Sequence, residues 1–233
     1  MGAMPMPGPG AMSMAWMPMC GQSWLGAAAS FLGMWTVMMT AMMLPSLIPA
    51  LWRYRQSLSR AGEWPPALLL TLMAAGYILV WVLLGAAVFP LGAAVVAMTV
   101  RHPALARAVP GLTGWVVILA GSLQLTRWKA NHLDCCRGRQ RGETWRCRGA
   151  APVSAVSACQ QGMRFGLHCS QCCASLTAVL LVTGVMDAAP MAAVTCAITL
   201  ERLAPAGERV ARVIGILVIG TGILLTLRAA GVG

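Results

Sequence analysis

Long runs of apolar residues dominate the chain and predict helices that cross a membrane. The first run extends from about Trp24 to Trp52 and contains no charged residue. A second charge-free stretch reaches from Trp64 to Val100, and as one straight helix it would measure about 54 Å at 1.5 Å per residue. That length exceeds the roughly 30 Å of bilayer hydrocarbon. We therefore expect a helix over about 66–89, with Pro90 kinking or breaking it, and a remainder that returns near the surface at Arg101.

The second half of the chain shows three further spans by the same criterion. One runs from about 110 to 126, and the run from 165 to 200 is again too long for a single crossing. Asp187 and Pro190 lie in its middle, so we expect two helices joined by a tight turn. The last span covers about 213–227, with three glycines that allow close helix packing: Gly215, Gly220 and Gly222. The expected fold is all-α, a polytopic membrane bundle of about six transmembrane helices.

Composition excludes an ordinary soluble domain. Of the 233 residues, 58% are hydrophobic and only 10% are charged, and the mean hydropathy is +0.73. Soluble domains carry about a quarter charged residues, so this chain lacks the charge to cover a water-facing surface. We expect a Met-rich extracytoplasmic segment at 1–22 and a transmembrane domain at 23–228, which includes a Cys-rich cytoplasmic loop at 129–164.

Positive charge is distributed unevenly along the chain, whose net charge is +11. Of the seventeen Lys and Arg residues, only Arg101, Arg107 and Arg228 fall in segments on one side of the predicted spans, and the other fourteen fall on the opposite side. Cytoplasmic loops of membrane proteins carry such an excess. We therefore expect a multi-pass membrane protein with both termini of this chain extracytoplasmic. Because this rule accounts for the surplus charge, we expect no nucleic-acid partner.

Sulfur-containing residues form a first cluster in the N-terminal segment. Thioethers are soft ligands that select Cu(I) over hard cations. They can still bind metal outside the cell, where thiols oxidise. This pattern favours metal capture, and the alternative is an apolar low-complexity leader. The cluster comprises three Met-x-Met pairs and one cysteine: Met4/Met6, Met12/Met14, Met17/Met19 and Cys20.

A second group of methionines lies in the first predicted span. Met34, Met38 and Met42 are spaced four residues apart, with Met39 and Met43 beside them. This spacing places a ladder of thioethers along one helix face. Such a ladder could line a metal route, although methionine is also a common flexible packing residue in apolar cores.

The third group lies on the predicted inner side. Cys169, Cys172 and Cys173 stand at i, i+3 and i+4, so they share one helical face. A reducing cytosol keeps them as thiols, which favours metal ligation or redox chemistry over structural disulfides. Metal ligation is the principal interpretation of these three cysteines, and the alternatives are thiol redox chemistry and ordinary packing of small residues. Other potential ligands in this region are His132, Cys135, Cys136, Cys147, Cys159 and His168.

Two carboxylates are candidate ligands as well. Glu201 should lie at the inner end of the fifth span, at a depth similar to that of Cys169. A carboxylate there costs up to about 2.5–3.5 kcal/mol unless it has a partner. Arg202 could be that partner, or a bound cation could be. Asp187 lies at the outer turn, where a solvated helix-turn role is an equal alternative to ligation.

Four motifs between about residues 22 and 220 form a further pattern. They are Trp35-x-x-Met38-Met39-x-Ala41-Met42-Met43-x-Pro45-Ser46, Cys169-x-x-Cys172-Cys173, Gly184-Val185-Met186-Asp187 and Glu201-Arg202-Leu203-x-Pro205. Together they resemble the hallmarks of an uncharacterised bacterial family of predicted metal-binding integral membrane proteins. This resemblance implies that the bacterial inner membrane is the location of the protein. Members often carry Gly and Trp around the Cys pair, where this chain has Gln171 and Ala174. Many also begin with an additional apolar helix, and such a helix upstream of Met1 would place the N-terminus inside.

These observations lead to one principal hypothesis and two alternatives. The principal hypothesis is a membrane protein that binds a soft metal ion for transport, storage or delivery, with Cu(I) as the first choice and zinc as the second. The outer Met pairs would capture the ion, the Met ladder would conduct it, and the inner thiols would receive it. We expect the lipid bilayer and the metal ion as partners, with a membrane protein or a metallochaperone as a further candidate.

The first alternative is a membrane-embedded thiol-disulfide oxidoreductase that uses Cys169 and Cys172. The second is a non-catalytic subunit of a larger membrane complex. The chain contains neither a P-loop nor a phosphorylatable Asp motif, so nothing indicates a pump, and we expect a binding protein more than an enzyme.

Overall fold

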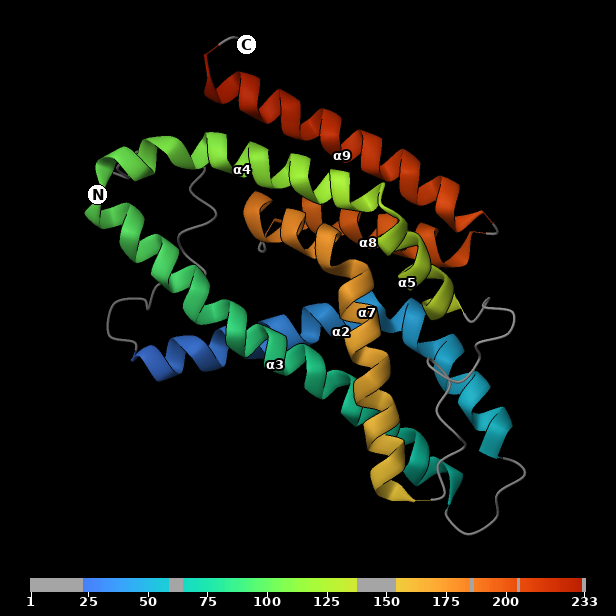
Figure 1. Cartoon of the computed structure of the whole chain (residues 1–233). Helices are drawn as coiled ribbons and strands as arrows, with labels where there is room; N and C mark the ends of the chain where they lie inside the picture. The colour runs from blue at the N-terminus through green and yellow to red at the C-terminus, as the bar shows by residue number, and fades with distance from the viewer. Residues whose placement is uncertain (1–22, 59–64, 138–153, 185–186, 205, 232–233) are drawn as a thin grey trace.

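The computed structural model describes residues 23–58, 65–137, 154–184, 187–204 and 206–231. Within these ranges all regular structure is helical, which confirms the all-α expectation. The helices, shown in Figure 1, are α2 (Trp24–Leu58), α3 (Pro66–Arg101), α4 (Pro103–Gln124), α5 (Arg127–Arg137), α7 (Ala155–Thr183), α8 (Ala188–Leu203) and α9 (Gly207–Ala229).

Five of these helices, α2, α3, α4, α7 and α9, are long and apolar enough to cross a membrane. The sixth expected span corresponds to α8, which has only 16 residues. At 1.5 Å per residue this helix is about 24 Å long, less than the thickness of bilayer hydrocarbon. The described part of the chain therefore holds five full-length candidate spans and the shorter α8, where the sequence indicated about six equivalent spans.

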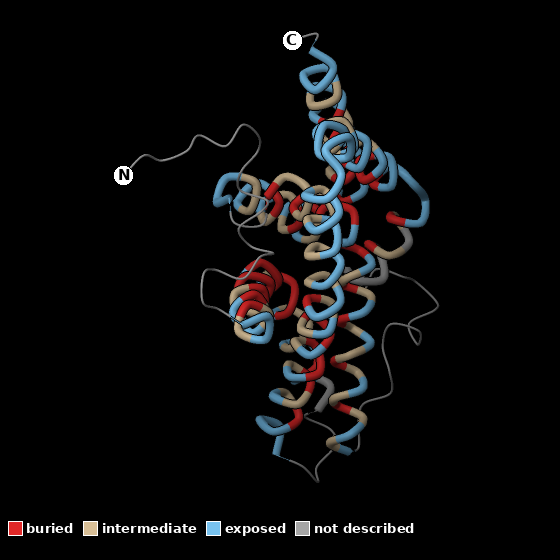
Figure 2. The backbone as a smooth tube through the Cα atoms, turned by 90° about the vertical axis from the view of Figure 1, so that its left-hand side faces the viewer, coloured by how far each residue is buried: buried red, intermediate tan, exposed pale blue. Residues whose placement is uncertain are grey.

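The outer surfaces of the long helices are apolar. Exposed large side chains follow α4 and α9 in particular, and Figure 2 shows extended exposed stretches along the tube. A contiguous apolar surface of this extent is unfavourable in water and is favourable against lipid tails. This distribution is consistent with a multi-pass membrane protein. The exposed residues on the two helices include Leu112, Trp115, Leu119, Leu123, Val213, Ile216, Leu217 and Leu224.

The expected break at Pro90 is not observed, because α3 continues through it to Arg101. A proline removes one backbone hydrogen bond, a loss that long apolar helices in membranes tolerate. The adjacent Phe89 packs on Phe31 of α2 with ring centroids 5.3 Å apart, which ties α3 to α2 next to the proline. The chain turns instead at His102, an extended residue between α3 and α4, and the two helices form the V seen in Figure 1.

Close backbone approach joins α3 to α7. A Cβ atom at Gly162 of α7 would collide with the backbone oxygen of Met73, and one at Gly76 of α3 would collide with that of Cys159. Only glycine fits at such positions, and small residues of this kind let membrane helices pack tightly. This contact places Tyr77 of α3 directly beside Cys169 of α7.

The α4–α9 pair, which runs side by side in Figure 1, is built in the same way. A Cβ atom at Gly121 would lie 3.0 Å from the backbone oxygen of Gly215, and one at Gly215 would lie 3.1 Å from that of Gly121. Gly114 and Gly222 form an equivalent pair about two helical turns away. Of the three glycines expected to pack closely, Gly220 alone has open space around its Cβ position.

Contact between Trp35 and α3 fixes the rotation of α2. The Trp35 indole lies flat against Gly85, where an added Cβ would be 2.5 Å from Trp35 Cδ1. Its Nε1 donates a hydrogen bond of 2.9 Å to the backbone oxygen of Trp81. Because a buried indole N–H requires such an acceptor, this bond sets which side of α2 faces the core. That side carries Met39 and Met43.

Part of segment 129–164, expected as a cytoplasmic loop, is helical. It contains nearly all of α5, which contacts α7, α8 and α9, and the first turns of α7. Lys129 is only 2% exposed. Since α7 begins at Ala155, ten residues before the expected start at 165, Cys169 lies halfway along this helix and not near its beginning.

Candidate metal centre

Two thiols from one face of α7 form the centre of the candidate site. Cys169 and Cys173 are separated by one helical turn, are 0% and 1% exposed, and belong to one buried cluster with residues of α2, α3 and α8. Cys172 is equally buried but packs in a different cluster, with Leu133 and Ala211. The Cys173 thiol interacts with both of the other thiols. The three cysteines are thus neighbours that face two different groups of helices.

A methionine of α2 supplies a third sulfur atom. The Sδ atom of Met43 lies 3.9 Å from Cys169 Sγ, and Met43 and Met39 are fully buried. Met38 and Met42 belong to the same buried cluster, and the half-buried Met34 packs against it. The expected ladder is therefore inside the protein. The thioether in contact with the thiol is Met43, from the neighbouring row of the helix.

Tyr77 is a partner of the thiols that sequence reasoning missed. Its hydroxyl lies 3.0 Å from Cys169 Sγ, at hydrogen-bonding distance, and the residue is 1% exposed. The chain contains only two tyrosines, and this one stands in an otherwise apolar run of α3. A phenol inside such a run was the available signal, because a buried phenol needs a hydrogen-bonding partner.

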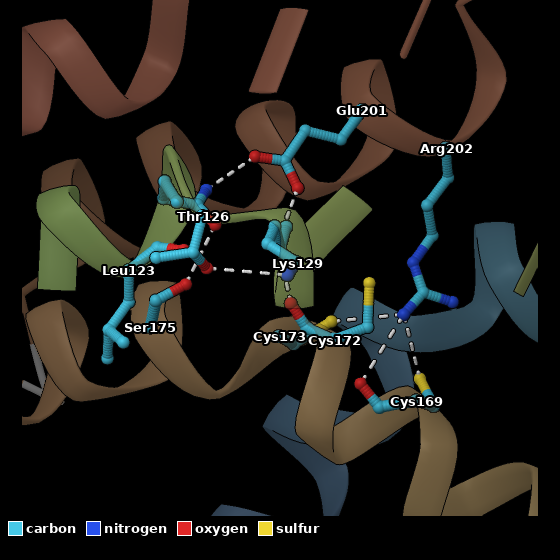
Figure 3. A network of polar contacts seen from close by, with 10 residues as sticks. Leu123, Thr126, Lys129, Cys169, Cys172, Cys173, Ser175, Glu201 and Arg202 are labelled. Carbon is cyan, nitrogen blue, oxygen red and sulfur yellow. Dashed lines mark hydrogen bonds and ion pairs between the residues drawn. The ribbon is translucent and has the colours of Figure 1, made fainter. Parts of the chain in front are cut away.

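A guanidinium group reaches the same two sulfur atoms. Arg202 of α8 extends toward α7, and its Nη2 atom donates to Cys169 Sγ and to Cys173 Sγ, each at 3.1 Å (Figure 3). The same nitrogen lies 3.5 Å from the backbone oxygen of Cys169. The sequence left Arg202 or a bound cation as the partner of Glu201, and the structure directs the charge of Arg202 to the thiols.

Glu201 has a different cationic partner. Its Oε2 atom lies 2.8 Å from Lys129 Nζ, its Oε1 atom accepts a 2.6 Å hydrogen bond from Gln124, and both charged residues are 2% exposed. Lys129 also donates to the backbone oxygen of Cys172 at 2.6 Å, and Ser175 donates to Gln124 at 2.8 Å. Figure 3 shows this network beside the thiols. The carboxylate is satisfied by protein groups and joins α4, α5 and α8, while Lys129 ties α5 to α7.

Two histidines face each other on the α5 side of α7. The rings of His132 and His168 have centroids 6.2 Å apart, and Trp128 packs edge-on against His132 at 4.5 Å. Burial lowers the pKa of His132, and the neighbouring His168 lowers it further. Both effects favour the neutral imidazole, which is the form that ligates metals. The side chains of Cys135 and Cys136, the other candidates on α5, lie outside the described residues.

Asp187 lies at the opposite end of α8 from Glu201 and Arg202. It is the N-cap of this helix, and its exposed carboxylate accepts a 3.2 Å hydrogen bond from the backbone N–H of Ala189. Glu201 follows fourteen residues later, about 21 Å along the helix. The observed role of Asp187 is the helix-turn role that the sequence left open.

The donor set suits a soft monovalent ion. Within the described ranges, no group of three or more His, Cys, Asp and Glu side chains forms a metal-binding arrangement. What converges is two thiols and one thioether, from Cys169, Cys173 and Met43. Thiolate and thioether ligands select Cu(I), which accepts linear or trigonal sets of soft donors. A tetrahedral zinc site would require further ligands.

Comparison with known proteins shows the family of the chain. No curated protein and no solved structure matches the chain. A family model described as copper chaperone matches residues 32–225, which are 194 of the 233 residues. The matched region contains both thiols and the three residues in contact with them, Met43, Tyr77 and Arg202. The resemblance noted from the motifs implied a family of metal-binding proteins, and this match names the family: the chain belongs to the copper chaperone family.

Proposed function

We propose that this protein holds one Cu(I) ion between Cys169, Cys173 and Met43 inside a membrane helix bundle, and delivers it to an acceptor protein. The observation that carries the proposal is the convergence of two buried thiols with a thioether 3.9 Å from Cys169. The family match supports copper as the cargo. The long apolar helices support a membrane location.

The chemistry of the three donors suits a carrier. Binding replaces the two thiol protons by one Cu(I) ion, so two protons leave and two copper–thiolate bonds form. The thioether is neutral and is the weaker donor. The ion can therefore release Met43 first and pass to another soft donor of the same buried cluster, without any intermediate in which the copper ion has lost all of its ligands. Tyr77 can hydrogen-bond the Cys169 sulfur throughout this exchange.

The remaining methionines give a route toward the centre. Met34, Met38 and Met42 follow one side of α2 and contact the cluster that contains the thiols. Because thiolates bind Cu(I) more tightly than thioethers, affinity would increase from this row to the cysteines. In the proposed orientation, with both termini outside, the N-terminal Met pairs would supply copper to the row. Those pairs lie outside the described residues.

The buried position of the thiols is unfavourable for the oxidoreductase alternative. Thiol–disulfide exchange requires a thiolate to reach a sulfur atom of the partner disulfide. Cys169 and Cys173 are enclosed by α2, α3 and α8, whereas a single metal ion is small enough to enter through side-chain motion. The arrangement therefore favours metal binding.

The direct test is metal stoichiometry of the purified protein in detergent. The wild type, reduced and loaded with Cu(I), should retain one copper per chain after gel filtration, and its X-ray absorption spectrum should show sulfur ligands only. Cys169→Ser with Cys173→Ser should abolish this copper. Cys196→Ser is the matched control, because Cys196 is an exposed cysteine of α8, and it should bind normally. Copper-free wild type, or full copper in the double variant, would exclude the proposed centre.

A further inference from the structure

We propose that Arg202 determines the metal selectivity of the centre. Its guanidinium would supply the one positive charge that neutralises a bis-thiolate complex of a monovalent ion. This inference rests on the proposed function, because it concerns the same two thiols. It goes further in assigning the preference for Cu(I) over divalent ions to a residue that does not ligate the metal.

The position of the guanidinium is the first argument. Arg202 Nη2 lies 3.1 Å from both sulfur atoms, so one donor group bridges the two thiols from the α8 side. Met43 and Tyr77 approach Cys169 from α2 and α3. The guanidinium is therefore placed beside the metal ligands, where hydrogen bonds to sulfur strengthen as the thiols become thiolates.

Charge balance is the second argument. Two thiolates and one Cu(I) ion form a complex of charge −1, and the neutral Met43 and Tyr77 do not alter it. Arg202 brings the sum to zero. With a divalent ion the bis-thiolate complex is itself neutral, and the arginine then leaves a net charge of +1. An uncompensated charge is costly in a buried apolar site.

The other nearby charges do not change this balance. Lys129 and Glu201 form their own ion pair at 2.8 Å, both 2% exposed, and together contribute zero net charge. Lys129 is further engaged with the backbone oxygen of Cys172. Among the charged groups that the structure describes at the thiols, Arg202 alone directs its cationic head to the sulfur atoms.

Substitution of Arg202 should therefore affect two metals in opposite ways. In Arg202→Gln the anionic Cu(I) complex loses its counter-charge and two charge-assisted hydrogen bonds, so its affinity should fall by about 100-fold. The affinity for Zn(II) should stay equal or rise, because the neutral zinc complex needs no counter-charge. Arg202→Lys keeps the charge and should retain most of the preference for Cu(I).

The experiment uses the full chain in detergent. Cu(I) affinity is measured by competition with a chromophoric Cu(I) chelator, and Zn(II) affinity by competition with a fluorescent zinc chelator. Arg209→Gln, an exposed position on α9, is the control. Gel filtration of every variant verifies that it is folded.

The outcomes separate the two proposals. Wild type that binds no Cu(I) would refute the proposed function itself. Wild type that binds Cu(I), with an unchanged Cu(I)-to-Zn(II) affinity ratio in Arg202→Gln, would overturn the role of Arg202 and leave the centre in place. Equal losses for both metals, or a loss in Arg202→Lys as large as in Arg202→Gln, would likewise show that the arginine holds the fold and not the charge.

Discussion

The buried ion pair between Lys129 and Glu201 allows a quantitative prediction about stability. Lys129→Met keeps an unbranched chain of similar length and removes the cation. Glu201 then retains Gln124 as a hydrogen-bond donor but loses its counter-charge, and the backbone oxygen of Cys172 loses the lysine donor. Because the change leaves an uncompensated buried carboxylate, we expect the free energy of unfolding to fall by about 3–5 kcal/mol.

This loss should be measurable as a melting temperature. For a chain of this size, one kcal/mol corresponds to about 2–4 °C, so the melting temperature should fall by roughly 6–20 °C. Tryptophan fluorescence in detergent would monitor unfolding, since the chain has nine tryptophans. Arg212→Met is the matched control, because Arg212 and Glu208 form an exposed pair at 3.6 Å. An exposed pair of this kind contributes at most about 1 kcal/mol.

A double-mutant cycle distinguishes the ion pair from lost packing. Adding Glu201→Gln to Lys129→Met removes the unpaired charge, so the double variant should be more stable than the sum of the two single changes predicts. We expect a coupling free energy of about 2 kcal/mol or more. Single variants that each cost less than about 1 kcal/mol, or that are simply additive, would refute the claim that this pair joins α5 to α8.

Three further predictions follow from packing, route and orientation. Gly162→Val should prevent α3 and α7 from approaching each other and should reduce the folded yield measured by gel filtration. Gly220→Val should be tolerated, because its Cβ position is open. Equal yields of the two variants would contradict the close contact. Met38→Leu with Met42→Leu should slow copper uptake into proteoliposomes without emptying the thiol centre at equilibrium. The change should lower the free energy of unfolding by less than about 1.5 kcal/mol per site. Equal uptake rates for wild type and the double variant would assign these methionines to packing. Thiol labelling of intact cells should modify Cys20 and spare Cys147, and labelling of Cys147 from outside would reverse the proposed orientation.

The helical architecture was readable from the sequence because it depends on local properties. Long apolar runs without charge can satisfy their backbone groups in a bilayer only as helices, and their lengths set the approximate bounds of α2, α4 and α9. The pairing of Cys169 with Cys173 was also local, since residues four apart share a helix face in any surroundings. The start of α7 could not be predicted from local properties. Its early turns are amphipathic and pack against α3.

The identity of the third sulfur ligand was decided by tertiary structure. A helix that is apolar all round gives no signal of which face turns inward, so Met34, Met38 and Met42 could not be distinguished from the row of Met39 and Met43. The choice between these rows follows from the rotation of α2, which the Trp35 contact with α3 sets.

The partners of the charged residues were likewise a tertiary result. Neighbours in sequence pointed to an interaction between Glu201 and Arg202, yet adjacent residues on a helix project in directions about 100° apart. Glu201 therefore faces α5 and meets Lys129, which charge counting had placed in a cytoplasmic loop, while Arg202 faces α7 and meets the thiols. Sequence determined that helices would form and which of them carry sulfur. Only the packing of α2, α3, α5 and α8 around α7 decided which side chains surround the two thiols, because each contact joins residues far apart in the chain.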